Sequence, residues 1–232
     1  RVKDWRGLPL FPARDVRSPI TVELGDEYVD WYTRVGTLYD IGGLNGIHLR
    51  AAGWAKGQAL QWAASSLQAG VGFLARLAIR RLNWTLDNPS LKAALAELRP
   101  YRGGPKSESL ELLFQRLKKQ IGSSALSPLV DDDELDDEDE EWRPDPELLS
   151  ELLDEGVYLI RNKAGQAKWD AVCQLIDKSE GEKIVLFAQP VETVTTIADI
   201  LEMRYGQRPS IIIGNQSDEE RTAQVDSFQS DN

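Results

Sequence analysis

Hydrophobic residues recur at helical spacing over most of this chain. From Asp26, a suitable N-cap, one apolar stripe is formed by Tyr28, Trp31, Tyr32, Val35 and Leu38. Residues 49–83 predict two helices, with Ser65 or Ser66 capping the second, and shorter helices are predicted at 90–98, 107–121 and 166–178. Pro146 is expected to begin another helix. A large part of the chain is therefore expected to be helical.

Two short runs near the C-terminus have the pattern of buried strands. Residues 183–189 and 209–214 are rich in Val and Ile, and helix-length segments follow them at 191–205 and 217–228. This order predicts a parallel βαβα arrangement. Residues 20–24 alternate between apolar and polar types, which predicts a half-buried strand. The expected fold class is therefore α/β with a large helical part after a short strand.

Charge is distributed unevenly along the chain. Its formal net charge is -11, yet residues 1–130 carry 18 basic and 11 acidic side chains. Ten of the eleven residues at 131–141 are acidic, which predicts a disordered spacer. The basic excess of residues 1–130 is compatible with contact to nucleic-acid phosphates.

Several classes of site are excluded by composition. One cysteine cannot form an intramolecular disulfide, and one histidine with one cysteine cannot build a structural zinc site. No secretory leader and no apolar run of membrane-spanning length is visible, so a cytoplasmic location without membrane contact is expected.

Two parts of the chain resemble Swi/Snf-type superfamily 2 helicases, in particular bacterial helicase-related proteins that include phage-defence proteins. A strand ending in Gln189, a helix, a strand ending in Gly214 and a helix with Arg221 and Phe228 resemble the start of the second RecA-like lobe. Residues 59–69, Ala-Leu-Gln-Trp-Ala-Ala-Ser-Ser-Leu-Gln-Ala, are similar to a signature between the lobes, with Leu67 where that family usually has Pro. Residues 2–14 and 20–24 resemble the exit from the first lobe, whereas residues 84–145 match no part of the family pattern.

The resemblance implies four segments and a role for each. Residues 1–48 would be the tail of the first RecA-like lobe, 49–122 a helical inter-lobe region, 123–147 an acidic disordered linker, and 148–232 part of the second lobe. The parent protein would be an ATP-dependent DNA translocase that uses ATP and Mg²⁺, binds double-stranded DNA and works within a larger protein complex.

Five residues are candidates for nucleic-acid contact: Arg76, Arg80, Arg81, Gln189 and Arg221. The three arginines at 76–81 lie on a predicted amphipathic helix and equally suit a solvated face. Gln189 equally suits an ordinary residue after a strand. In helicase second lobes an arginine at the position of Arg221 holds the nucleic acid or its own loop, but beside Glu219 and Glu220 it also suits an ordinary surface.

Enzymatic activity is not expected from this chain alone. No Gly-x-x-x-x-Gly-Lys-Ser/Thr motif is present, so nothing would cradle the phosphates of ATP, and neither a catalytic residue nor a cofactor is assigned. The alternative to a motor segment is a non-enzymatic adaptor, in which a helical domain is tethered to a small α/β module that binds a protein. A small-molecule α/β enzyme is a third possibility, which the missing Gly-rich loop after a strand disfavours.

Overall fold

The computed structural model describes residue 6 and residues 18–40, 47–102, 107–121, 143–179, 181–214 and 216–230, with side chains from residue 53 onward in the second helix. Every regular element within these ranges is helical. They are α1 (Asp26–Thr37), α2 (Ile47–Ser65), α3 (Leu67–Arg81), α4 (Pro89–Leu98), the 3₁₀ turn η1 (Arg99–Tyr101), α5 (Leu110–Ile121), α6 (Pro146–Arg161), α7 (Gln166–Asp177), α8 (Val191–Tyr205) and α9 (Asp218–Ser230).

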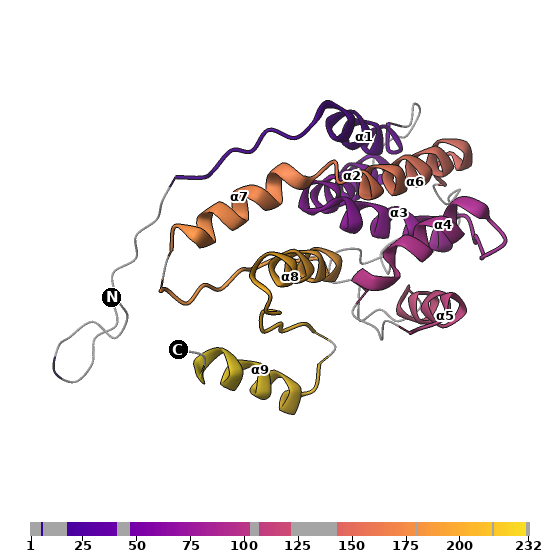
Figure 1. Cartoon of the computed structure of the whole chain (residues 1–232). Helices are drawn as coiled ribbons and strands as arrows, with labels where there is room; N and C mark the ends of the chain where they lie inside the picture. Colours follow the sequence, from indigo (N-terminus) through magenta and orange to yellow (C-terminus); the bar gives the residue numbers. More distant parts are fainter. Residues whose placement is uncertain are drawn as a thin grey trace.

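Helix α3 lies at the centre of the fold. It packs against α2, α4, α5, α6 and α8, while α1 rests on α2 and α6 (Figure 1). The bundle core is apolar, and Trp31 of α1 is fully buried in it. The indole Nε1 of Trp31 donates a hydrogen bond to the carbonyl of Leu152 in α6 over 2.9 Å, so the ring is fixed by packing and by a polar contact.

Local sequence signals explain where several helices begin. Ser66 caps α3 by accepting a hydrogen bond from the amide of Ala69, and Asp145 caps α6 just before Pro146. Such caps satisfy amides that have no partner inside the helix. The predicted helices are thus confirmed, including the buried stripe of Tyr28, Trp31 and Val35, although Gly25 rather than Asp26 is the N-cap of α1.

The predicted α/β architecture is wrong. None of the described residues belongs to a strand, and the runs at 20–24, 183–189 and 209–214 are extended but not assembled into a sheet. A strand needs a neighbour for its backbone groups. In the last run, the amides of Ile211 and Ile213 instead bond to the side chains of Gln224 and Gln216. The parallel RecA-like βαβα unit is therefore absent from the described part of the chain.

Other expectations lie partly outside the described residues. The acidic run at 131–141 and all of residues 2–14 except Arg6 belong to this group. The division into four segments stays a prediction, and α6 packs against α1, α3 and α4. Across the helices that the structure describes, none is both long and apolar enough to cross a membrane.

Candidate functional site

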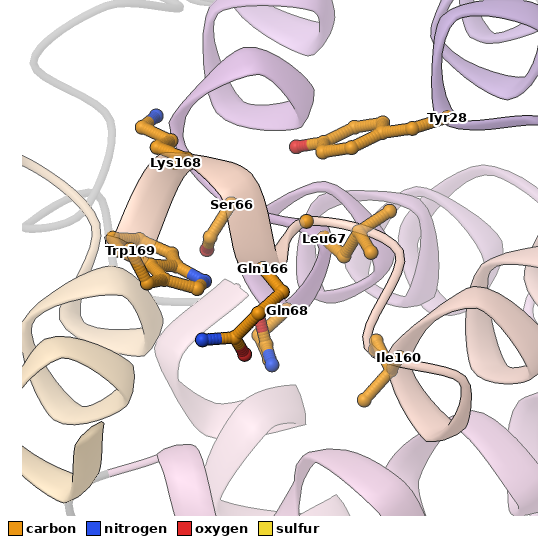
Figure 2. Close-up of a pocket in the computed structure, with 9 residues that line it drawn as sticks. Tyr28, Ser66, Leu67, Gln68, Ile160, Gln166, Lys168 and Trp169 are labelled. Carbon is orange, nitrogen blue, oxygen red and sulfur yellow. The ribbon is translucent and has the colours of Figure 1, made fainter. Parts of the chain in front are cut away.

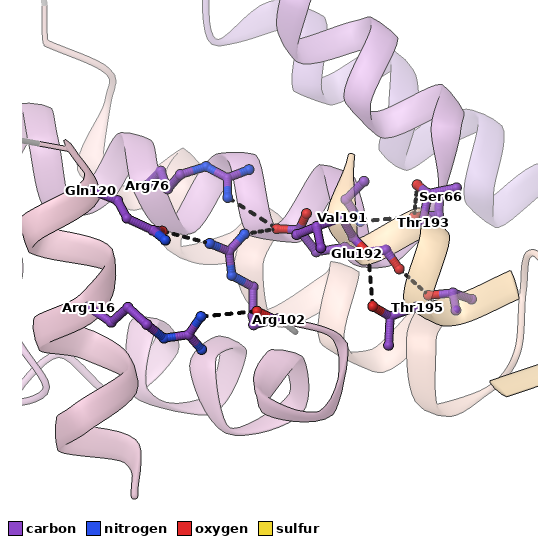
Figure 3. A network of polar contacts seen from close by, with 11 residues as sticks. Ser66, Arg76, Arg102, Arg116, Gln120, Val191, Glu192, Thr193 and Thr195 are labelled. Atoms are coloured by element: carbon purple, nitrogen blue, oxygen red, sulfur yellow. Dashed lines mark hydrogen bonds and ion pairs between the residues drawn. The ribbon is translucent and has the colours of Figure 1, made fainter. Parts of the chain in front are cut away.

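A buried carboxylate marks the contact between α8 and the helical bundle. Glu192, in the first turn of α8, is completely buried. Its Oε1 accepts a hydrogen bond from Nη1 of Arg76 on α3 over 3.1 Å and another from Nη1 of Arg102, which follows η1 (Figure 3). Two arginines from different elements therefore converge on one oxygen.

Both arginines are held by further contacts. The guanidinium of Arg76 lies 4.3 Å from the ring centre of Trp62, in cation–π geometry. Arg102 donates from Nη2 to Oε1 of Gln120 over 3.2 Å, and its carbonyl accepts from Arg116 over 3.1 Å. Trp62 and Gln120 thus hold the two guanidinium groups, and Arg116 holds the backbone of Arg102. None of these three residues belongs to α8.

The cluster is charged and not fully hydrogen-bonded. Burial alone would raise the pKa of Glu192, but the charges of Arg76 and Arg102 outweigh it and hold that pKa below its ordinary value. Burial lowers the pKa of Arg76 to about 10, so it also stays charged at neutral pH. Two cations thus face one anion, and buried atoms Nη2 of Arg76, Nε of Arg102 and Oε2 of Glu192 have no hydrogen-bond partner.

The absence of a side chain at Gly72 makes room for this carboxylate. A Cβ on Gly72 of α3 would lie 2.5 Å from Oε1 of Glu192, inside van der Waals contact. Close approach of α8 to α3 therefore depends on a glycine at this position.

Uncharged polar contacts extend the same junction. The hydroxyl of Thr193 lies 2.9 Å from that of Ser65 and 2.8 Å from that of Ser66. Nε2 of Gln61 donates to Oε1 of Gln189 over 3.0 Å. We call this set of contacts, from Gln61–Gln189 to the Glu192 cluster, the α8 seat.

The structure brings together only some of the predicted nucleic-acid residues. Arg76 and Gln189 both lie in the α8 seat. Arg80 and Arg81 lie in the last turn of α3, where Arg80 is exposed and Arg81 is half-buried. Arg221 on α9 donates to the carbonyl of Gly214 over 3.0 Å, a contact with its own preceding turn. Whether any of the five binds nucleic acid stays a prediction.

Sequence reasoning missed several residues of the seat. Glu192 has the position of an ordinary acidic residue near a helix N-terminus, and nothing in the local pattern indicates its burial. Arg102 follows η1 in a stretch that matched no known pattern. Besides the candidates Arg76 and Gln189, the Ser65-Ser66 pair carried a signal, and it indicated a helix start rather than a contact with Thr193.

Ser66 also lines a small cavity between α1, α3, the end of α6 and α7 (Figure 2). Its volume is about 30 Å³, room for only one or two water molecules. At its margin Nζ of Lys168 donates to the carbonyls of Ala64 and Ser65 over 2.8 and 2.7 Å, and burial lowers the pKa of Lys168. The cavity is too small for a nucleotide or cofactor, and within the described ranges no cluster of His, Cys, Asp and Glu is arranged to hold a metal ion.

Comparison of the chain with models of known families, with curated proteins and with solved structures gave no match. The site is therefore interpreted from its geometry and from the sequence resemblance alone.

Proposed function

We propose that this chain is a helical coupling segment of a larger Swi/Snf-like, DNA-dependent ATPase. One observation supports the proposal most directly. Residues 59–69, which resemble the signature between the lobes, contact the segment from Gln189 to Thr193 in the α8 seat through Gln61–Gln189 and Ser65/Ser66–Thr193. The segment with the inter-lobe signature is thus joined to a segment about 128 positions later in the sequence, as a coupling role would need.

The proposed role is mechanical rather than chemical. Because Glu192 and Thr193 tie the start of α8 to α3, a displacement of α8 would be transmitted to the bundle. ATP and Mg²⁺ would be bound by other parts of the parent protein. Residues 1–130, with their basic excess, would supply contacts to the phosphates of double-stranded DNA.

Salt-dependent DNA binding by the purified chain tests this proposal. A labelled DNA duplex is titrated by fluorescence anisotropy at a series of salt concentrations. Each neutralised phosphate contributes roughly -0.9 to the slope of log affinity against log salt. Replacing Arg80 and Arg81 by Gln should flatten the slope by up to about 1.8 if both side chains touch phosphate.

Arg221→Gln is the control for the loss of an arginine charge, because it removes one positive charge from α9. It should leave the slope of this chain nearly unchanged, since Arg221 bonds to its own turn. Absence of DNA binding even at low salt would refute the proposal. A slope that ignores Arg80 and Arg81 would remove the end of α3 from the DNA-contact surface.

A non-enzymatic helical adaptor is the second candidate, and an exposed apolar segment favours it. Before α8, Val185 is 60%, Leu186 45% and Phe187 95% exposed. An apolar patch of this kind is typical of protein-binding surfaces. A chain that binds no DNA but binds a protein partner, with binding lost in Phe187→Ser and retained in Arg80→Gln, would favour the adaptor.

A further inference from the structure

We infer that Arg76 and Arg102 form a phosphate-binding site that Glu192 occupies in this conformation, so that α8 and a DNA phosphate compete for the same two guanidinium groups. The inference rests on the proposed function in DNA binding. It adds a specific site and a relation between DNA contact and the position of α8.

The donor geometry suits a phosphate. Both guanidinium groups aim at one carboxylate oxygen, and they come from separate elements that the bundle already fixes. A phosphate oxygen accepts the same charge-assisted hydrogen bonds, and arginine is well suited to bind phosphate in this way.

The unsatisfied atoms indicate that Glu192 is an incomplete partner. Nη2 of Arg76 and Nε of Arg102 are buried donors without an acceptor. Nη2 of Arg76 remains unused because Glu192 directs only Oε1 at the arginines, while its Oε2 is also without a partner. Nε of Arg102 lies on the guanidinium edge that Nη2 turns toward Gln120. A phosphodiester offers two free oxygens on a tetrahedral centre and can accept from Nη2 of Arg76 in addition to the two Nη1 donors.

Charge explains why one anion should replace another. If Glu192 left and nothing took its place, two buried cations would lack a counter-charge, which is strongly unfavourable. The side chain of Arg76 is 21% exposed, so the edge of the cluster reaches solvent. A phosphate approaching at that edge would compensate both arginines as Glu192 withdraws.

Removing the charge of Glu192 tests the inference. In Glu192→Gln, the affinity for a labelled DNA duplex should rise, and the slope of log affinity against log salt should steepen by up to about 1.8 for two added contacts. In the double variant Glu192→Gln/Arg102→Gln, which keeps only Arg76, about half of the added slope, roughly 0.9, should disappear. Glu182→Gln is the control, because it removes one negative charge from an exposed side chain outside the cluster.

Gly72→Ala gives a second route to the same state if Glu192→Gln does not fold. Its Cβ would push Oε1 away from the arginines while every charge is kept, so DNA affinity should again rise. Circular dichroism confirms that each variant is folded before it is titrated.

The outcomes separate the inference from the proposed function. Wild-type binding that neither Glu192→Gln nor Gly72→Ala strengthens would overturn the inference and leave the proposed function standing. A gain that is undiminished in the double variant, or that Glu182→Gln reproduces, would also overturn it. If neither the wild type nor any variant binds DNA at low salt, the proposed function fails, and the inference fails with it.

Discussion

Gly156→Ala places one methyl group at a tight crossing of α1, α3 and α6. Gly156 lies on α6, and a Cβ there would be 2.4 Å from Cγ2 of Val71 on α3 and 3.2 Å from Cζ2 of Trp31 on α1. Val71 and Trp31 are both fully buried. The hydrogen bond from Trp31 to Leu152 also prevents the indole from moving aside without loss.

Two opposing effects decide the size of the change. An interior helix position gains about 0.5–1 kcal/mol when Gly is replaced by Ala. Overpacking of a dense core costs about 1–3 kcal/mol of stability. Because the indole of Trp31 is fixed, the cost of Gly156→Ala is expected near the upper end of this range. The net expectation is a loss of about 2 kcal/mol, which lowers the melting temperature by roughly 4–8 °C in a domain of this size.

Gly57→Ala is the matched control. Gly57 lies inside α2, and a Cβ there would meet nothing within 4 Å. Only the helix-propensity gain applies, so this variant should unfold at a slightly higher temperature than the wild type. Urea and thermal unfolding followed by circular dichroism would measure both. Equal stabilisation of the two variants would refute the close contact of α1, α3 and α6.

Two further predictions concern the α8 seat. The pKa of Glu192 is lowered in the folded state, so its ionised carboxylate stabilises the fold. This stabilisation is fully present above the unfolded pKa of Glu192, about 4.3, and is lost as the pH falls through the lower pKa of the folded state. The stability difference between wild type and Glu192→Gln, up to about 3–5 kcal/mol at pH 7, should therefore shrink on acidification, and a difference independent of pH would contradict this. Ser66→Ala removes the cap of α3 and the contact with Thr193, so it should cost at least about 1 kcal/mol in urea unfolding, and an unchanged midpoint would contradict the assignment.

Helices were predictable from the sequence because their signals are local. The serine before Leu67 and the proline at 146 lie within one turn of the helix starts that they determine. The spacing of Tyr28, Trp31 and Val35 identified the buried face of α1 without knowledge of its neighbours. Capping and amphipathic spacing act over three or four residues, so a single sequence contains them.

Strands were not predictable in the same way. A run such as 183–187 has the β-branched composition of a buried strand, but only a neighbouring strand makes it one. In this structure Phe187 is almost fully exposed. The composition of the segment therefore indicated that it could pair in a sheet, but not that a partner strand is present.

The α8 seat depended on contacts across the chain. Arg76 was recognised as a candidate for binding an anion, but its observed partner, Glu192, lies 116 positions later. No local pattern connects the two, and Gly72, which makes room for the carboxylate one helical turn before Arg76, gives no sign of this role in the sequence. Long-range charge pairs of this kind need the fold before they can be assigned.

Helices α6 and α8 both contact α3, but they do so with different chemistry. The buried residues of α6 are aliphatic apart from one glycine, whereas those of α8 are Glu192, Thr193, Thr195, Thr196, Ala198 and Leu201. Thr195 and Thr196 donate to carbonyls within α8, so they satisfy their hydroxyls without holding the bundle. Apolar burial stabilises a contact more than a buried ion cluster does, whereas charged groups can exchange one partner for another. The apolar contact between α3 and α6 is therefore the stable core of the bundle. The contact between α8 and α3 is the one that our inference makes sensitive to an incoming anion.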